Sequence, residues 1–102
     1  MISLLAESKP KIARLCDEHG VKRLAAFGSA VSGRFDTETS DIDFVVAFRD
    51  TASLDYANRY FDFAEALERI LGRKVDLITE RSIRRPSFRR AIESAHELVY
   101  ER

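Results

Sequence analysis

The sequence is poor in several residue types that mark particular protein classes. Its single cysteine, Cys16, excludes an internal disulfide framework and a cysteine zinc cluster. Four glycines and two prolines give no sign of a fibrous or disordered chain. A net charge is also lacking, because seventeen basic residues balance seventeen acidic ones, so the binding of nucleic acid by bulk charge is not expected.

Long apolar segments are absent as well. No run approaches the ~20 residues that span a membrane, and residues 1–10 lack the basic start and apolar centre of a signal peptide. We therefore expect a cytoplasmic protein without a membrane partner, in which Cys16 is a reduced thiol. The length of 102 residues predicts one domain over residues 1–102.

The spacing of apolar residues predicts alternating helices and strands. The expected helices cover residues 3–19, 54–71 and 87–95, and the expected strands cover residues 21–27, 41–48 and 74–79. Ser53 is a candidate N-cap of the long central helix, and Gly72 is its expected end. Residues 30–40 are small and polar and predict a loop, with a short helix after Ser29 as an alternative. Residues 98–100 form either a further edge strand or a packed tail.

Two aspartates open the second expected strand. Asp41 and Asp43 lie two residues apart, so their side chains project to one face of a strand, and Ile42 and Phe44 project to the other. Adjacent carboxylates repel each other, and a divalent cation such as Mg²⁺ or Mn²⁺ removes that cost. Taken alone, the pair is more typical of solvated aspartates at the end of a strand.

A third aspartate lies inside an apolar strand. Asp76 stands between Val75 and Leu77, which is an unfavourable place in a central strand. Alone, it is best explained as an edge-strand residue that faces water. Together with Asp41 and Asp43, it predicts a cluster of three carboxylates, which can hold two metal ions and align an in-line phosphoryl displacement.

A glycine–serine turn follows the first expected strand. Gly28 lets the backbone approach a ligand closely, and N–H groups at a strand-to-helix turn bind phosphate oxygens. The hydroxyl of Ser29 adds one more donor. Gly-Ser is common in turns, so its weight comes from its position one loop before Asp41.

These motifs together resemble a known signature. Gly28 and Ser29, a loop, and then the segment 40–46 are similar to the signature of the DNA polymerase beta-like nucleotidyltransferases, and within them to the minimal nucleotidyltransferase (MNT) group. Asp76 matches the third carboxylate of that family, on the strand after the long helix. The resemblance extends over residues 21–100, almost the whole chain.

The resemblance implies an α/β (α+β) fold, with a small mixed sheet and helices packed mainly on one face. It implies that Gly28 and Ser29 contact a nucleotide triphosphate, and that Asp41 and Asp43 are catalytic ligands of two Mg²⁺ ions, with Mn²⁺ as an alternative. Asp76 is implied as a further catalytic metal ligand that helps to activate the attacking hydroxyl. The implied reaction transfers a nucleotidyl group, usually AMP from ATP, and releases pyrophosphate.

The resemblance also implies a biological role. MNT proteins are often partners of HEPN proteins, which are helical RNases. In such toxin–antitoxin pairs the MNT member neutralises the toxin, in some of them by adding AMP to a toxin tyrosine. The expected partners are therefore ATP and a HEPN-type protein, in a homo- or hetero-oligomer, and nucleic acid is not an expected partner.

The loop departs from the family pattern. Many relatives carry arginines where this chain has Ala30 and Ser32, with only Arg34 remaining nearby, and the loop is one residue longer than the commonest spacing. Two functional classes therefore stay open. The first is a metal-dependent nucleotidyltransferase that acts on a protein hydroxyl. The second is an MNT-fold binding module that has lost catalysis and inhibits a partner protein by contact.

Several other residues have both a functional and a structural interpretation. Cys16 and His19 could be a ligand pair, although a buried thiol and a helix-end histidine explain them more simply. Tyr56 and Tyr60 could be modification sites, although packing on the long helix explains them more simply. A basic cluster could bind phosphate, RNA or an acidic partner, or it could form a solvated helix face. Its members are Arg81, Arg84, Arg85, Arg89 and Arg90.

Overall fold

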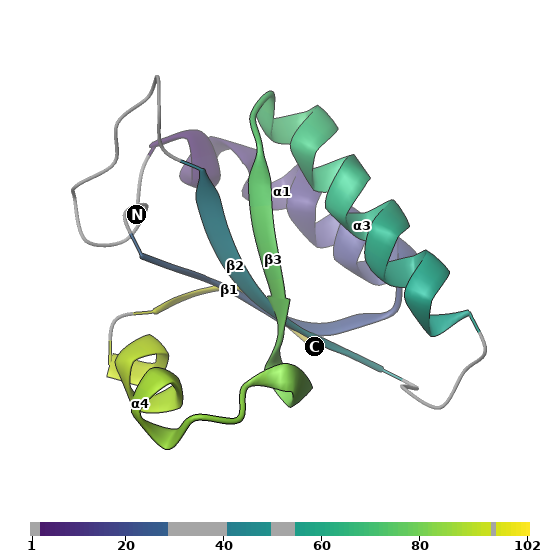
Figure 1. The fold of residues 1–102 in the computed structure, drawn as a ribbon. Helices are drawn as coiled ribbons and strands as arrows, with labels where there is room; N and C mark the ends of the chain where they lie inside the picture. The colour runs from purple at the N-terminus through teal and green to yellow at the C-terminus, as the bar shows by residue number, and fades with distance from the viewer. Residues whose placement is uncertain (1–2, 29–40, 50–54, 95) are drawn as a thin grey trace.

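The computed structural model describes residues 3–28, 41–49, 55–94 and 96–102. Four strands form a mixed sheet in the order β3-β2-β1-β4, with two long helices against one face and a short helix against the other (Figure 1). The strands are β1 (Val21–Phe27), β2 (Ile42–Phe48), β3 (Val75–Thr79) and β4 (Glu97–Glu101). The helices are α1 (Ser3–Glu18), α3 (Tyr56–Leu71) and α4 (Pro86–Ser94), and a 3₁₀ turn, η1 (Glu80–Ser82), follows β3.

The pairing of the strands brings three chain segments to one end of the sheet. β1 is antiparallel to β2, with Phe27 opposite Asp43, and β2 is parallel to β3, with Asp43 opposite Asp76. The end of β1 therefore lies beside the beginnings of β2 and β3. A parallel pair needs a long crossover connection, and α3 forms the main part of it.

One face of the sheet, called here the closed face, packs against α1 and α3. Ile42, Phe44 and Val46 of β2 are almost fully buried there, because alternate side chains of a strand project to the same face. Ile12 of α1 and Leu67 of α3 belong to the same core and have no exposed area. The burial of apolar surface in this layer is the main force that holds the fold together.

The opposite face, called here the open face, has two different halves. Ala25 of β1 and Val45 of β2 pack against Ile92 of α4, which covers the apolar half. The other half begins at the register partners Asp43 and Asp76. The open face therefore changes from apolar to acidic along the length of two strands.

Local sequence signals set the ends of the helices. α3 ends at Gly72, which has a φ of 68° and whose N–H donates a hydrogen bond to the Glu68 carbonyl at 2.8 Å. This left-handed conformation strains residues other than glycine, which explains why the helix ends there. α1 continues through Pro10, which is exposed and removes one helical hydrogen bond without ending the helix.

The predicted fold class is confirmed, because the sheet is small and mixed and its helices pack mainly on one face. Residues 98–100 lie in the edge strand β4 and not in a packed tail. β2 and β3 begin one residue later than predicted, at Ile42 and Val75, and α4 begins at Pro86, while residue 95 lies outside the described residues. The predicted N-cap Ser53 and the predicted loop of residues 30–40 lie outside the described residues.

The structural interpretation of Cys16 and His19 agrees with their positions. Cys16 is buried in the closed-face core, and this burial raises the pKa of its thiol to about 12. His19 follows α1, with its Nδ1 atom 2.8 Å from the Leu15 carbonyl oxygen. In the described part of the chain, no helix is both long enough and apolar enough to cross a membrane.

Candidate active site

The turn after β1 requires glycine for two reasons. Gly28 has a φ of 71°, in the left-handed region that other residues rarely adopt. A Cβ atom at this position would also lie 2.5 Å from Oδ2 of Asp43, closer than nonbonded atoms approach. The lack of a side chain therefore lets the end of β1 come close to a carboxylate of β2.

Two of the predicted site residues are direct neighbours across the sheet. Asp43 and Asp76 are register partners in the parallel pair of β2 and β3, and neighbouring strands lie about 4.8 Å apart. Both side chains project to the open face, since the residues on either side of each aspartate belong to the closed-face core. Asp43 is half-buried and Asp76 is exposed. Asp41, also exposed, immediately precedes β2.

The charges of Asp76 and Asp41 act on Asp43. Burial raises the pKa of Asp43, and the charges of Asp76 and Asp41 raise it further. Each effect opposes the ionised form of Asp43. The polar half of the open face therefore holds negative charges in a place where a bound cation would lower their energy.

The residues present fit a cation that is bound by protein and substrate oxygens together. Mg²⁺ commonly binds one or two carboxylates, and phosphate oxygens and waters complete its coordination. Asp43 and Asp76 offer such a pair, and Asp41 adjoins it. Among the described residues, no three His, Cys, Asp or Glu side chains form a complete set of metal ligands by themselves. The ligand roles of the three aspartates stay predictions.

Part of the predicted nucleotide site lies outside the described residues. Ser29 belongs to this part, and so do the loop positions Ala30, Ser32 and Arg34. The contribution of Ser29 to phosphate binding stays a prediction. Gly28 is the described member of the turn, and its close approach to Asp43 is the feature that connects the turn to the carboxylates.

The tyrosines of α3 make structural contacts beside the carboxylates. The hydroxyl of Tyr60 donates a hydrogen bond to the Leu77 carbonyl at 2.5 Å, which fixes α3 to β3. Burial raises the pKa of Tyr60, and the charge of Asp76 raises it further. Tyr56 packs edge-to-face against Phe48, with ring centroids 5.5 Å apart. These contacts agree with the packing interpretation of both tyrosines.

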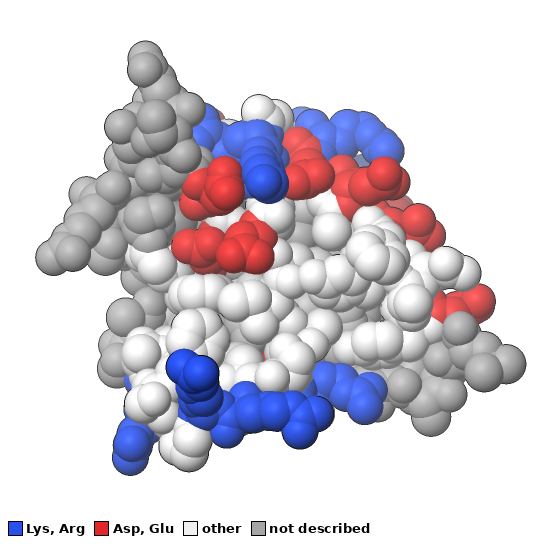
Figure 2. Space-filling view, viewed as in Figure 1, with Lys and Arg blue, Asp and Glu red and all other residues white. Residues whose placement is uncertain are grey.

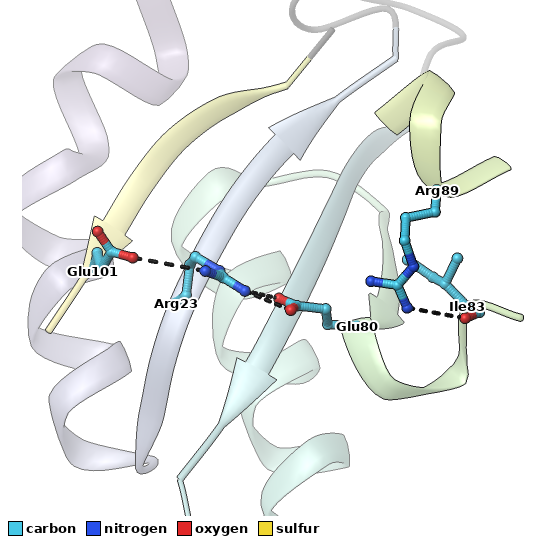
Figure 3. A network of polar contacts seen from close by, with 5 residues as sticks. All are labelled: Arg23, Glu80, Ile83, Arg89 and Glu101. Carbon is cyan, nitrogen blue, oxygen red and sulfur yellow. Dashed lines mark hydrogen bonds and ion pairs between the residues drawn. The ribbon is translucent and has the colours of Figure 1, made fainter. Parts of the chain in front are cut away.

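An ion-pair network that was not predicted from the sequence crosses the open face. Arg23 of β1 donates hydrogen bonds to the Glu80 carboxylate and lies 3.7 Å from the carboxylate of Glu101 (Figure 3). The hydrogen bond to Glu80 is the main reason that the pKa of Arg23 is raised. The signal in the sequence was an arginine inside the apolar strand of residues 21–27, which needed a partner. The network joins β4, β1 and η1.

The basic cluster occupies its own part of the surface. Figure 2 shows acidic side chains in the upper half of the view, where basic side chains lie beside them, and a row of further basic side chains along the lower edge, with uncharged surface between the two regions. The exposed members of the cluster are Arg81, Arg84, Arg85 and Arg90. Arg89 differs, because its guanidinium donates a hydrogen bond to the Ile83 carbonyl at 3.1 Å (Figure 3).

Comparison with known proteins gives matches over most of the chain. The family model described as the nucleotidyltransferase domain matches residues 10–99. A candidate protein adenylyltransferase of Methanocaldococcus jannaschii, MJ1379, is 44% identical over 86 residues, which are 84% of this chain and 82% of that protein. The residues matched by the family model include Gly28 and all three aspartates.

Solved structures give the same result at the level of the fold. The structure of a candidate minimal nucleotidyltransferase is similar with a TM-score of 0.75 and 31% identity, over 91% of this chain and 90% of that one. A chain of the complex between a tri-AMPylated HEPN toxin of Shewanella oneidensis and an MNT antitoxin is similar with a TM-score of 0.65. At 20% identity, over 96% of this chain and 73% of that one, the second likeness concerns the fold alone.

Proposed function

Because this chain belongs to the nucleotidyltransferase domain family and to its minimal group, we propose that it transfers AMP from ATP to a hydroxyl of a partner protein. The observation that carries the proposal is the position of Asp43. This residue is next to Gly28 on one side and opposite Asp76 on the other. The turn that we propose as the phosphate site and a pair of carboxylates therefore adjoin each other on the open face.

The substrate phosphates are proposed to lie between Gly28 and the aspartates. Backbone N–H groups at the Gly28 turn bind phosphate oxygens, and Ser29 is proposed to add its hydroxyl. Asp41, Asp43 and Asp76 would hold Mg²⁺, or Mn²⁺ in its place. When bound, this metal neutralises the triphosphate and stabilises the charge that develops at the reacting phosphorus.

Asp76 is proposed to accept the proton of the acceptor. The hydroxyl oxygen forms a bond to the α-phosphorus of ATP, and the bond from that phosphorus to the bridging oxygen breaks. Pyrophosphate leaves with the electron pair of the broken bond, and the hydroxyl proton passes to the Asp76 carboxylate. Asp76 is suited to this step because it is exposed and lies on the edge strand β3, where a partner can approach.

The partner is proposed to be a HEPN-type protein, with this chain as the antitoxin of the pair. Support comes from the Shewanella complex, in which an MNT antitoxin accompanies a HEPN toxin that carries AMP. The name of the similar Methanocaldococcus protein, an adenylyltransferase for proteins, supports the same class of acceptor.

A second candidate function is inhibition by contact without catalysis. The observation that favours it is the loop sequence, in which Ala30 and Ser32 occupy positions where many relatives carry arginine. Fewer cations near the triphosphate would weaken the binding of ATP. The presence of all three aspartates favours the transferase.

The two candidates are separated by one experiment. The protein is incubated with Mg²⁺, ATP labelled in its α-phosphate, and the product of the neighbouring gene. The double variant Asp41→Asn/Asp43→Asn should lower labelling of the partner about 100-fold or more. The control Asp62→Asn/Glu65→Gln removes the same charge from exposed positions of α3 and should label the partner normally. Inhibition of the partner that survives the loss of labelling would favour the binding module instead.

A further inference from the structure

A groove adjoins the carboxylates on the same face of the sheet. It has a volume of about 260 Å³ and is lined by Ile78, Ser82, Ile83, Arg84, Arg85 and Phe88. Ile78 is two residues after Asp76 on β3, so the two side chains project to the same face about 6.6 Å apart along the strand. An extended segment of a few residues that occupies the groove therefore reaches Asp76.

The lining of the groove combines an apolar floor with a basic rim. Phe88 is 41% exposed although its ring packs edge-to-face against Phe27, with centroids 6.5 Å apart. Arg84 and Arg85 are exposed, and neither forms an ion pair with a carboxylate of the described residues. Such a surface offers two guanidinium groups and an aromatic ring to a partner.

The rim is held in place by the rest of the fold. Arg89 of α4 donates a hydrogen bond to the Ile83 carbonyl (Figure 3). The Ser82 hydroxyl donates one to the Thr79 carbonyl at 2.8 Å. Glu80, at the start of the same segment, is bound to Arg23 of β1. These contacts hold the backbone of residues 79–83, directly before Arg84, at several points. Less conformational entropy is therefore lost when a ligand binds to the groove.

The charge distribution gives the groove a direction. The carboxylates of Asp43 and Asp76 lie at the start of β2 and β3, whereas Arg84 and Arg85 line the groove together with Ile78. Figure 2 shows acidic side chains in the upper half of the view, with basic side chains beside them, and further basic side chains along the lower edge, across uncharged surface. A flexible acidic segment is attracted to the basic end and repelled from Asp43 and Asp76. An uncharged hydroxyl side chain is the part of such a segment that can approach Asp76.

From these observations we propose that the groove between β3 and α4 binds an acidic segment of the partner protein and presents its acceptor hydroxyl to Asp76. The acceptor role of the segment depends on the proposed adenylyl transfer, whereas its binding does not. The groove thereby selects the substrate by charge, and the arginines of residues 84–85 determine specificity without touching the reacting phosphorus.

Binding is tested with two labelled peptides that contain one tyrosine, flanked by glutamates in the first and by lysines in the second. Fluorescence anisotropy should detect binding of the acidic peptide only. The variant Arg84→Glu/Arg85→Glu should weaken it roughly three- to tenfold, the range expected for the loss of two exposed ion pairs, and should favour the lysine peptide. The control Lys11→Glu/Arg14→Glu makes the same charge change at exposed positions of α1 and should have no effect.

Four results would overturn the proposal. The acidic peptide binds no better than the lysine peptide, or the Arg84→Glu/Arg85→Glu variant binds it as the unchanged protein does. The third result is that a single-stranded RNA of equal charge binds more tightly than the peptide and that the variant loses affinity for this RNA. This result would mean that the groove binds nucleic acid. The fourth result is that the variant has a higher KM for ATP and an unchanged KM for the neighbouring gene product. This result would mean that the two arginines bind the triphosphate.

The failure of this proposal can be distinguished from the failure of the transferase. If the protein binds the acidic peptide selectively but does not label the partner with ATP, the docking groove is supported and the proposed function is contradicted. If labelling of the partner requires Asp43 but is unchanged in Arg84→Glu/Arg85→Glu, the transferase is supported and the docking groove is contradicted. A circular dichroism melt of each variant shows whether it is folded, since these arginines are exposed and their replacement is expected to leave the fold intact.

Discussion

The closed and the open face of the same sheet differ in what their side chains gain from folding. On the closed face, Phe44 has no exposed area and contributes apolar burial. On the open face, the preceding residue Asp43 is half-buried, and folding raises its pKa through burial and the neighbouring charges of Asp76 and Asp41. Adjacent residues of one strand therefore have opposite effects on stability, because successive side chains project to opposite faces. Stability and function should be separable along this strand.

The largest effect is expected from Phe44→Ala on the closed face. Truncation of a fully buried phenylalanine should lower the free energy of unfolding by about 3–5 kcal/mol, through lost burial and the cavity that remains. Urea denaturation measures this change. Val45→Ala, on the open face, removes fewer atoms from a site beside α4 and should cost clearly less. Equal losses for the two variants would contradict the distinction between the faces.

A smaller effect is expected from Gly28→Ala, with Gly72→Ala as its control. Both glycines have φ near 70°, so each alanine should cost about 1 kcal/mol of stability from the left-handed conformation alone. Only at Gly28 would the new Cβ meet a side chain, the Oδ2 of Asp43 at 2.5 Å, whereas nothing lies within 4 Å at Gly72. We expect Gly28→Ala to lose stability further and to lose AMP transfer, and Gly72→Ala to keep transfer. Equal transfer by both variants would mean that the turn does not position Asp43.

The ion pair between Arg23 and Glu80 should contribute less. Their side chains are 39% and 35% exposed, so solvent screens the interaction. A double-mutant cycle with Arg23→Gln and Glu80→Gln should give a coupling energy of about 0.5–1 kcal/mol, which falls as salt is added. A coupling near zero would show that the network on the open face is held by the surrounding packing.

The smallest effect, and the one of opposite sign, is expected from Asp43→Asn. A carboxyl with a raised pKa in the folded state binds its proton more tightly there than in the unfolded chain. The protonated carboxyl of Asp43 therefore stabilises the fold at low pH. This stabilisation is lost as the pH rises from the ordinary Asp pKa of about 3.9 through the raised pKa of the folded state. The variant should therefore melt at a higher temperature than the unchanged protein at pH 7.

Calorimetry at several pH values checks this prediction. The difference in Tm should be small at pH ~3, where Asp43 is protonated, and larger at neutral pH. Addition of Mg²⁺ should raise the Tm of the unchanged protein by mass action and should have less effect on Asp43→Asn. A variant that melts below the unchanged protein at neutral pH would show that the carboxylate of Asp43 stabilises the fold.

The carboxylates of the site and the meeting of Asp76 with Asp43 could be predicted from the sequence, but the other neighbours of the site could not. The spacing of Asp41 and Asp43 predicts a common face from the period of a strand, but β2 begins at Ile42, so the strand places only Asp43 on that face. The partner of Arg23 was not predictable, since Glu80 is distant in the chain and lies in a turn of three residues. The groove beside Asp76 was missed for the same reason, because α4 returns to the open face only in the folded chain.

The sequence by itself determined the alternation of helices and strands, the division of β2 into apolar and acidic positions, and the need for glycine before the loop. These properties follow from side-chain period and backbone sterics, which act within a few residues. The sequence predicted that Asp76 would meet Asp43, but only the tertiary structure decided that the two are direct register partners and that an aromatic, basic groove adjoins them. The local alternation of apolar residues limits the register of a parallel pair, but which residues pair depends also on how the intervening helix packs and on backbone hydrogen bonds between distant segments.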